Sequence, residues 1–116
     1  MARTALTVAG VSLAGLDVKV ASNGTAGDVA NGNVVAGNDG SRLFVIVANT
    51  SVDTAYDVTF VTPGTVGAQA HTIEDEVIEV AFGDVKAYGP FPLAEYTSEL
   101  QIDVENAALK LKAVRI

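Results

Sequence analysis

The segment RLFVIVAN, residues 42–49, decides the fold class of this chain. It is a continuous apolar run of strand length, and it is rich in Val, Ile and Phe. Such residues favour β-structure, and a run without alternation is typical of a strand buried on both faces. We therefore expect residues 42–49 to form a central strand. The Asn49-Thr50-Ser51 segment that follows predicts a hairpin-type loop to the next strand.

Outward from this segment, apolar and polar residues alternate with a period of two. That period is the signature of strands with one solvated face. The pattern is clear in LDVKV (16–20), ELQIDVE (99–105) and LKLKAVRI (109–116). Further predicted strands lie at 56–62 and 76–82, and a weaker one lies at 6–9.

The gaps between these segments carry turn residues, and helical periodicity is missing. Asn-Gly, Pro-Gly and Gly-Pro pairs punctuate the chain, as turns require. Residues 92–96, after Pro90, predict at most a single helical turn. The chain therefore reads as all-β: a single-domain antiparallel β-sandwich or small barrel of about seven to nine short strands.

We expect one domain over residues 1–116, because 116 residues is the size of a single domain and no linker is visible. Residues 1–15 predict an N-terminal arm or a first strand. Residues 21–41 are rich in Gly and Asn and predict a long loop or a weak hairpin. Long loops in compact domains are often functional.

Composition excludes several classes of function. Seven Lys and Arg against 14 Asp and Glu give a net charge of −7, and the chain has no Cys. An acidic surface argues against nucleic acid and against anionic membranes as partners. No apolar run reaches the length of about 20 residues that a membrane helix needs. Disulfide scaffolds and Cys-ligated zinc are also excluded.

Candidate chemistry is sparse, so we expect no enzyme, no catalytic residue and no cofactor. His71 is the only histidine, and we interpret it as an exposed loop residue. The sequence has neither a Gly-x-Ser-x-Gly elbow nor a phosphate-binding loop. Glu74, Asp75, Glu76 and Glu79 form the densest acidic cluster. We interpret it as a solvated strand edge, and a weak metal site there is left open.

The aromatic residues offer two interpretations. Phe44 and Phe60 lie inside strand patterns and are predicted to be core. Tyr88, Phe91 and Tyr96 surround Gly89-Pro90 and predict a small packed cluster that fixes this corner. The alternative is an aromatic binding patch, as in a carbohydrate-binding β-sandwich module.

Four segments, taken in their order along the chain, are similar to segments of a known group of proteins. RLFVIVANTS (42–51), YDVTFVTPGTV (56–66), KAYGPFPLAEY (86–96) and the terminal LKLKAVRI resemble a group of small tailed-bacteriophage structural proteins that includes head decoration, or capsid cement, proteins. The resemblance covers residues 33–116. Where such proteins show a Thr-Val-Thr-Val-Pro-Ala-Gly strand, this chain has EVIEVAFG (76–83). The first 32 residues match no segment of that group.

This resemblance implies a structural virion protein that is made in the host bacterial cytoplasm and binds the exterior of the assembled capsid. Its partner would be the major capsid protein. Other head-completion or tail structural proteins, and a carbohydrate-binding module, are the alternatives. Oligomeric state is left open, although a homotrimer would suit the three-fold positions of a capsid. The N-terminal arm and the Gly/Asn-rich loop supply the candidate contacts, which are Met1, Ala2, Arg3, Thr4, Asn23, Asn31 and Asn38.

Overall fold

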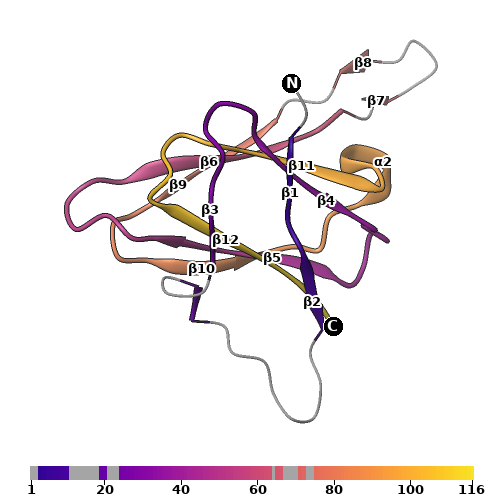
Figure 1. Ribbon diagram of the computed structural model, residues 1–116. Coiled ribbons are helices and arrows are strands. Elements are labelled where there is room, and N and C mark those ends of the chain that lie inside the picture. Colours follow the sequence, from indigo (N-terminus) through magenta and orange to yellow (C-terminus); the bar gives the residue numbers. More distant parts are fainter. Residues whose placement is uncertain (1–2, 11–18, 21–23, 64, 67–70, 73–74) are drawn as a thin grey trace.

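A computed structural model describes residues 3–10, 19–20, 24–63, 65–66, 71–72 and 75–116. Within these residues the chain forms twelve strands and one short helix. Figure 1 shows two sheets packed face to face. The predicted all-β, sandwich-like fold is confirmed.

The first sheet has five strands, and its order is β1-β4-β11-β6-β9. Neighbouring strands in this sheet pair antiparallel, except that β1 runs parallel to β4. The prediction of an antiparallel sandwich therefore holds for most pairs but not for the N-terminal strand. The bounds are β1 (Thr4–Ala5), β4 (Asn33–Ala36), β11 (Glu99–Val104), β6 (Tyr56–Val61) and β9 (Glu76–Val80).

The second sheet has the order β10-β5-β12-β2, and β3 also pairs with β12. Only the β12–β2 pair is parallel. Strands β2 and β3 lie on different halves of β12, at residues 113–115 and 110–111. The bounds are β10 (Val85–Tyr88), β5 (Leu43–Asn49), β12 (Leu109–Arg115), β2 (Val8–Gly10) and β3 (Thr25–Ala26).

The N-terminal segment crosses from one sheet to the other. Strand β1 belongs to the first sheet and β2, only two residues later, to the second. Leu6 lies between them, is only 7% exposed, and joins the core cluster. The described residues 3–10 thus form first strands of the sandwich, the second of our two predictions for residues 1–15.

The core fills the space between the inner faces of the two sheets. Along β5, Leu43, Val45 and Val47 are fully buried, whereas the alternate residues Phe44 and Ile46 are only partly covered. Our prediction that this strand is buried on both faces holds on the outer face for Ala48, which is fully buried, but is wrong for Phe44 and Ile46. Strand β5 is still central, because it pairs with β10 on one side and β12 on the other.

Asn49-Thr50-Ser51 forms a corner between the sheets and not the predicted hairpin loop. Strand β5 lies in the second sheet and β6 in the first, so they do not pair. Asn49 is 2% exposed. Its Nδ2 donates to the carbonyl oxygens of Thr54 (3.0 Å) and Val80 (2.9 Å), and its Oδ1 accepts from Ser51 N (2.9 Å). A buried amide with all these partners satisfies backbone groups that the corner leaves unpaired.

The prediction of a long loop or a weak hairpin over residues 21–41 needs correction, because β3 and β4 lie inside this range and belong to different sheets. These strands are short and flanked by Gly, so their pairing depends on β12, β1 and β11 and not on a local pattern. The predicted helical turn is confirmed as α2 (Leu93–Tyr96). The predicted strand at 16–20 lies mostly outside the described residues.

A third, two-stranded sheet projects from the body at one end in Figure 1. It pairs β7 (Thr65–Val66) with β8 (His71–Thr72) and so extends the β6–β9 hairpin. The register shifts by one residue, since Phe60 pairs with Glu76 but Thr65 pairs with Thr72. A shift of this kind is the mark of a bulge.

Candidate interaction surface

Arg3 fastens the N-terminal segment to the first sheet. Its Nη1 lies 2.6 Å from Oδ1 of Asp103 on β11 and 3.2 Å from the carbonyl oxygen of Ile102. It also lies 3.4 Å from the carbonyl oxygen of Asn33 on β4. One guanidinium therefore holds β1 beside β4 and β11. Over residues 3–10 the predicted arm is part of the folded body.

A compact turn at residues 28–33 lies beside this clamp. Thr4 Oγ1 donates to Oδ2 of Asp28 (2.5 Å), and the backbone N of Asn31 donates to Oδ1 (3.1 Å). The amide Nδ2 of Asn31 donates to Oδ2 as well (3.3 Å). The Asp28 backbone N donates to Oδ1 of Asn33 (2.9 Å), which closes the turn from its other end.

The charge on Asp28 is stabilised by these donors. The Thr4 hydroxyl, followed by the Asn31 backbone N–H, lowers the pKa of Asp28 below its ordinary value of 3.8. Gly32 adopts a φ of 76°, in the left-handed region, and a Cβ there would collide with Nη1 of Arg3. The turn is therefore set by Asp28, Gly32 and the N-terminal strand together. It presents Val29, which is 55% exposed, at its tip.

Asn38 occupies a different place and has a different role. It is 3% exposed. Its Nδ2 donates to the carbonyl oxygens of Phe91 and Thr97, both at 2.9 Å, and its Oδ1 accepts from Gly40 N (3.1 Å). These bonds tie the segment after β4 to the segment around α2. The polar groups of Asn38 are thus engaged inside the fold.

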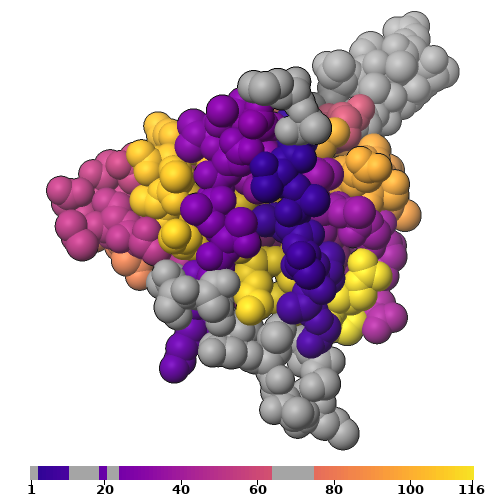
Figure 2. All heavy atoms as spheres, in the orientation of Figure 1, coloured from indigo at the N-terminus to yellow at the C-terminus, as the bar shows by residue number. Residues whose placement is uncertain are grey.

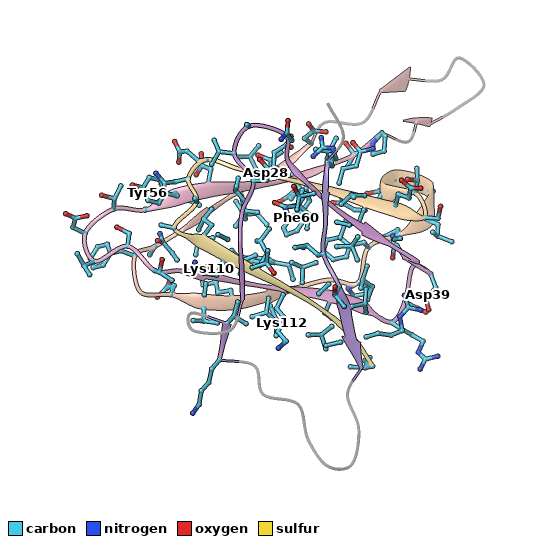
Figure 3. All side chains as sticks on the ribbon, in the orientation of Figure 1. Asp28, Asp39, Tyr56, Phe60, Lys110 and Lys112 are labelled. Carbon is cyan, nitrogen blue, oxygen red and sulfur yellow. The ribbon has the colours of Figure 1, made fainter. Side chains whose placement is uncertain are left out.

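Of the seven predicted contact residues, the structure brings Arg3, Thr4 and Asn31 together at one end of β4. Asn38 lies beyond the other end of that strand. Figure 3 shows the same separation through the labelled carboxylates Asp28 and Asp39. Met1, Ala2 and Asn23 lie outside the described residues.

The loop beyond Asn38 lies beside two arginines, Arg42 before β5 and Arg115 at the end of β12. Asp39 Oδ1 accepts from the backbone N of Ser41 (3.1 Å) and of Arg42 (2.9 Å). These bonds lower the pKa of Asp39, and the charges of Arg115 and Arg42 lower it further. Arg42 Nε donates to the carbonyl oxygen of Ile116 (2.6 Å), and Arg115 donates to the carbonyl of Gly37. The sequence patterns predict no role for Arg42 or Arg115.

The aromatic residues Tyr88, Phe91 and Tyr96 pack into the main core. The ring centroid of Phe60 lies 5.5 Å from that of Tyr88 and 5.0 Å from that of Phe91. Phe91 lies 5.3 Å from Tyr96 in an edge-on arrangement. Burial is the main cause that raises the pKa of both tyrosines. The packed-cluster prediction is confirmed, although the cluster is continuous with the core and not a satellite of it.

The acidic cluster is spread out along the β9 edge. Glu74 lies outside the described residues. Oδ1 of Asp75 accepts from the backbone N (2.9 Å) and from Oγ1 (3.1 Å) of Thr62, at the base of the projecting sheet. No group of His, Asp and Glu among the described residues is arranged to hold a metal ion. The backbone of His71 pairs with Val66 in the β7–β8 ladder, so His71 belongs to a short strand and not to the predicted loop.

A hollow of about 230 Å³ lies over β12. Figure 2 shows the yellow surface of β12 open between the purple β3 and the indigo β2. Among the described residues that line it, Lys112, labelled in Figure 3, is the ionisable one. The other lining residues are Leu6, Thr7, Ala9, Thr25, Leu111 and Ala113.

Comparisons with known proteins return no match to a family model, to a curated protein or to a solved structure. Among the described residues, no helix is long and apolar enough to cross a membrane.

Proposed function

We propose that this protein is a structural component of a tailed-phage virion that binds the outer surface of the assembled capsid and stabilises it. The segments on which the family resemblance rests support this proposal. Residues 42–51 contain β5 and the Asn49 corner, 56–66 contain β6, and 86–96 contain most of β10 and all of α2. They supply the interior strands β5 and β6, the edge strand β10 and the corner after β5.

The single observation that carries the proposal is the preformed surface at the N-terminal end of the molecule. The Arg3 clamp and the Asp28 turn fix this surface, so a partner can bind it without first ordering the chain. In Figure 1 the start of β1, the 28–33 turn and the projecting β7–β8 sheet lie at the same end. We assign this end to the capsid, with Arg3, Thr4 and Asn31 as contact residues around an exposed Val29.

Such a protein acts by mass action. A ligand that binds only the assembled shell stabilises that state by RT ln(1 + [L]/Kd) per site, about 2.7 kcal/mol at a free concentration one hundred times Kd. Many sites per particle multiply the effect. The acidic balance of 14 Asp and Glu against seven Lys and Arg also keeps the protein from competing for packaged nucleic acid.

Two exposed valines allow a matched test of this assignment. Val29 is 55% exposed in the Asp28 turn, and Val52 is 88% exposed in the corner between β5 and β6. Capsid shells assembled without this protein are mixed with each variant and sedimented, and the bound fraction is measured against concentration.

We expect Val29→Asp to weaken binding at least about tenfold, because a carboxylate in a contact area must be desolvated. We expect Val52→Asp to bind like the wild type. Equal binding by all three proteins, or a loss confined to Val52→Asp, would contradict the assignment of this end to the capsid.

A further inference from the structure

The two sheets leave their long free edges on the same side of the molecule. Strand β9 ends the first sheet and β10 ends the second, and only residues 81–84 join them. Gly83 N donates to the carbonyl oxygen of Asn49 (3.0 Å) and Asn49 N donates to that of Asp84 (2.9 Å), so this turn wraps around the end of β5. Both labels stand at the left of Figure 1.

These edges differ in length from the others in the described chain. Strands β9 and β10 have five and four residues, whereas β1, β2 and β3 have two, three and two. A strand at the edge of a sheet presents unpaired backbone N–H and C=O groups, and short edge strands limit that hazard. The β9–β10 side is therefore the place where another strand can add to either sheet.

The same side carries exposed apolar residues. Val77 on β9 is 58% exposed, Phe82 in the connecting turn is 54% exposed, and Val85 on β10 is 52% exposed. Val77 and Val85 point away from the core, because their neighbours Ile78 and Lys86 pair with the inward-facing Val58 and Val47. The open edges are thus flanked by apolar surface that a partner strand would cover.

The charges on the two edges are opposite. Strand β9 presents the exposed carboxylates Glu76 and Glu79, and β10 presents the exposed ammonium of Lys86. Like charges on facing strands are destabilising and opposite charges are favourable. Pairing of β9 with another β9, or of β10 with another β10, would place like charges together. Pairing of β9 with β10 places opposite charges together.

We propose that the β9–β10 side is a dimer interface, in which β9 of one copy pairs antiparallel with β10 of a second copy and the reverse pairing forms in the other sheet. A two-fold axis along the strands brings β9 of each copy beside β10 of the other copy. Both sheets therefore continue across the dimer. Glu76 pairs with the buried Phe60 and Lys86 with the buried Val47, so their opposite charges lie on the same face of the continued sheets. This inference does not depend on capsid binding.

The test measures the mass of the purified full-length chain by light scattering over a concentration range of about 10 µM to 1 mM. We expect twice the 11.9 kDa of one chain at high concentration. Glu76→Lys should weaken the dimer at least about tenfold, since the substituted pair occurs twice in the interface. The charge swap Glu76→Lys with Lys86→Glu should restore it.

Glu99→Lys is the matched control. Glu99 is also an exposed first residue of a strand, but β11 lies between β4 and β6 and has no free edge. It should dimerise like the wild type. A chain that stays at the mass of one copy over the whole concentration range overturns the proposal. The β9–β10 side would then be open to a strand of another protein. A trimer mass, or a swap that fails to restore the dimer while circular dichroism shows it folded, overturns it as well.

Discussion

Arg3 and Asp103 are separated by 100 residues in the sequence, and their side chains meet with Nη1 and Oδ1 only 2.6 Å apart. The guanidinium also bonds the carbonyl oxygens of Ile102 and Asn33. This contact joins the first described residue of the chain to β11 and β4. It fixes the position of the N-terminal segment against these two strands.

Loss of this contact should lower the free energy of unfolding by a small but measurable amount. The Arg3 and Asp103 side chains are 25% and 50% exposed, and exposed ion pairs contribute about 0–1 kcal/mol. With the two carbonyl bonds, we expect Arg3→Ala to lower the free energy of unfolding by about 1 kcal/mol, or about 4 °C in Tm. Denaturation of Arg3→Ala, Asp103→Ala and the double variant gives the coupling energy. A coupling energy of zero would contradict a stabilising contact between Arg3 and Asp103.

The two asparagines at opposite ends of β4 should differ in their effect on stability. Asn38→Ala leaves the carbonyl oxygens of Phe91 and Thr97 and the Gly40 N–H without their partner. We expect a loss of about 2–3 kcal/mol. Asn31→Ala removes one long side-chain bond in a half-buried turn and should cost less than about 1 kcal/mol. Equal losses in urea denaturation would refute this distinction.

Phe60 lies between the two sheets, as its label in Figure 3 shows. It is 1% exposed and contacts the rings of Tyr88 and Phe91. Phe60→Ala should therefore cost about 3–5 kcal/mol, because the cavity adds to the lost burial. Val52→Ala is the control, since Val52 is 88% exposed and should change stability by less than about 0.5 kcal/mol. A small effect at Phe60 would mean that the sheets do not pack as described.

The Asp28 carboxylate should make a pH-dependent contribution to stability. Its pKa is lower in the folded chain than the ordinary 3.8. The contribution is therefore complete above pH 3.8 and is lost as the pH falls through the lower folded value. Titration of the Asp28 carboxyl carbon by NMR should give a midpoint below 3.8. Thr4→Val removes the largest cause and should move that midpoint upward; an unmoved midpoint would rule out the Thr4 hydroxyl as that cause.

Much of the fold could be predicted because the signal is local. Alternation places strands at 99–105 and 109–116, and β11 and β12 lie there. Strand β4, with only Asn33–Ala36, has no such pattern, and it forms because β1 and β11 lie on either side of it. The crossing at Leu6 and the sheet change after Asn49 depend on tertiary packing, which alternation does not encode.

The candidate site could be predicted less well. The N-terminal segment and the Asn31 turn lack an internal pattern, so their bonds are not predictable from the sequence: Arg3 bonds Asp103 on the distant strand β11, and Asn31 bonds Asp28. The Asn38-Asp-Gly segment signals a turn, and Asn38 does accept a bond from Gly40 N. Its burial against the carbonyls of Phe91 and Thr97 depends on where β4 and α2 pack.

The central claim is that this chain is a capsid-binding virion component. Mass spectrometry of purified particles of the encoding phage, with labelled peptides as internal standards, measures its copy number directly. We predict hundreds of copies per particle. Absence from the particles, or roughly six to twelve copies, as expected for a ring at a single portal vertex, would contradict the claim.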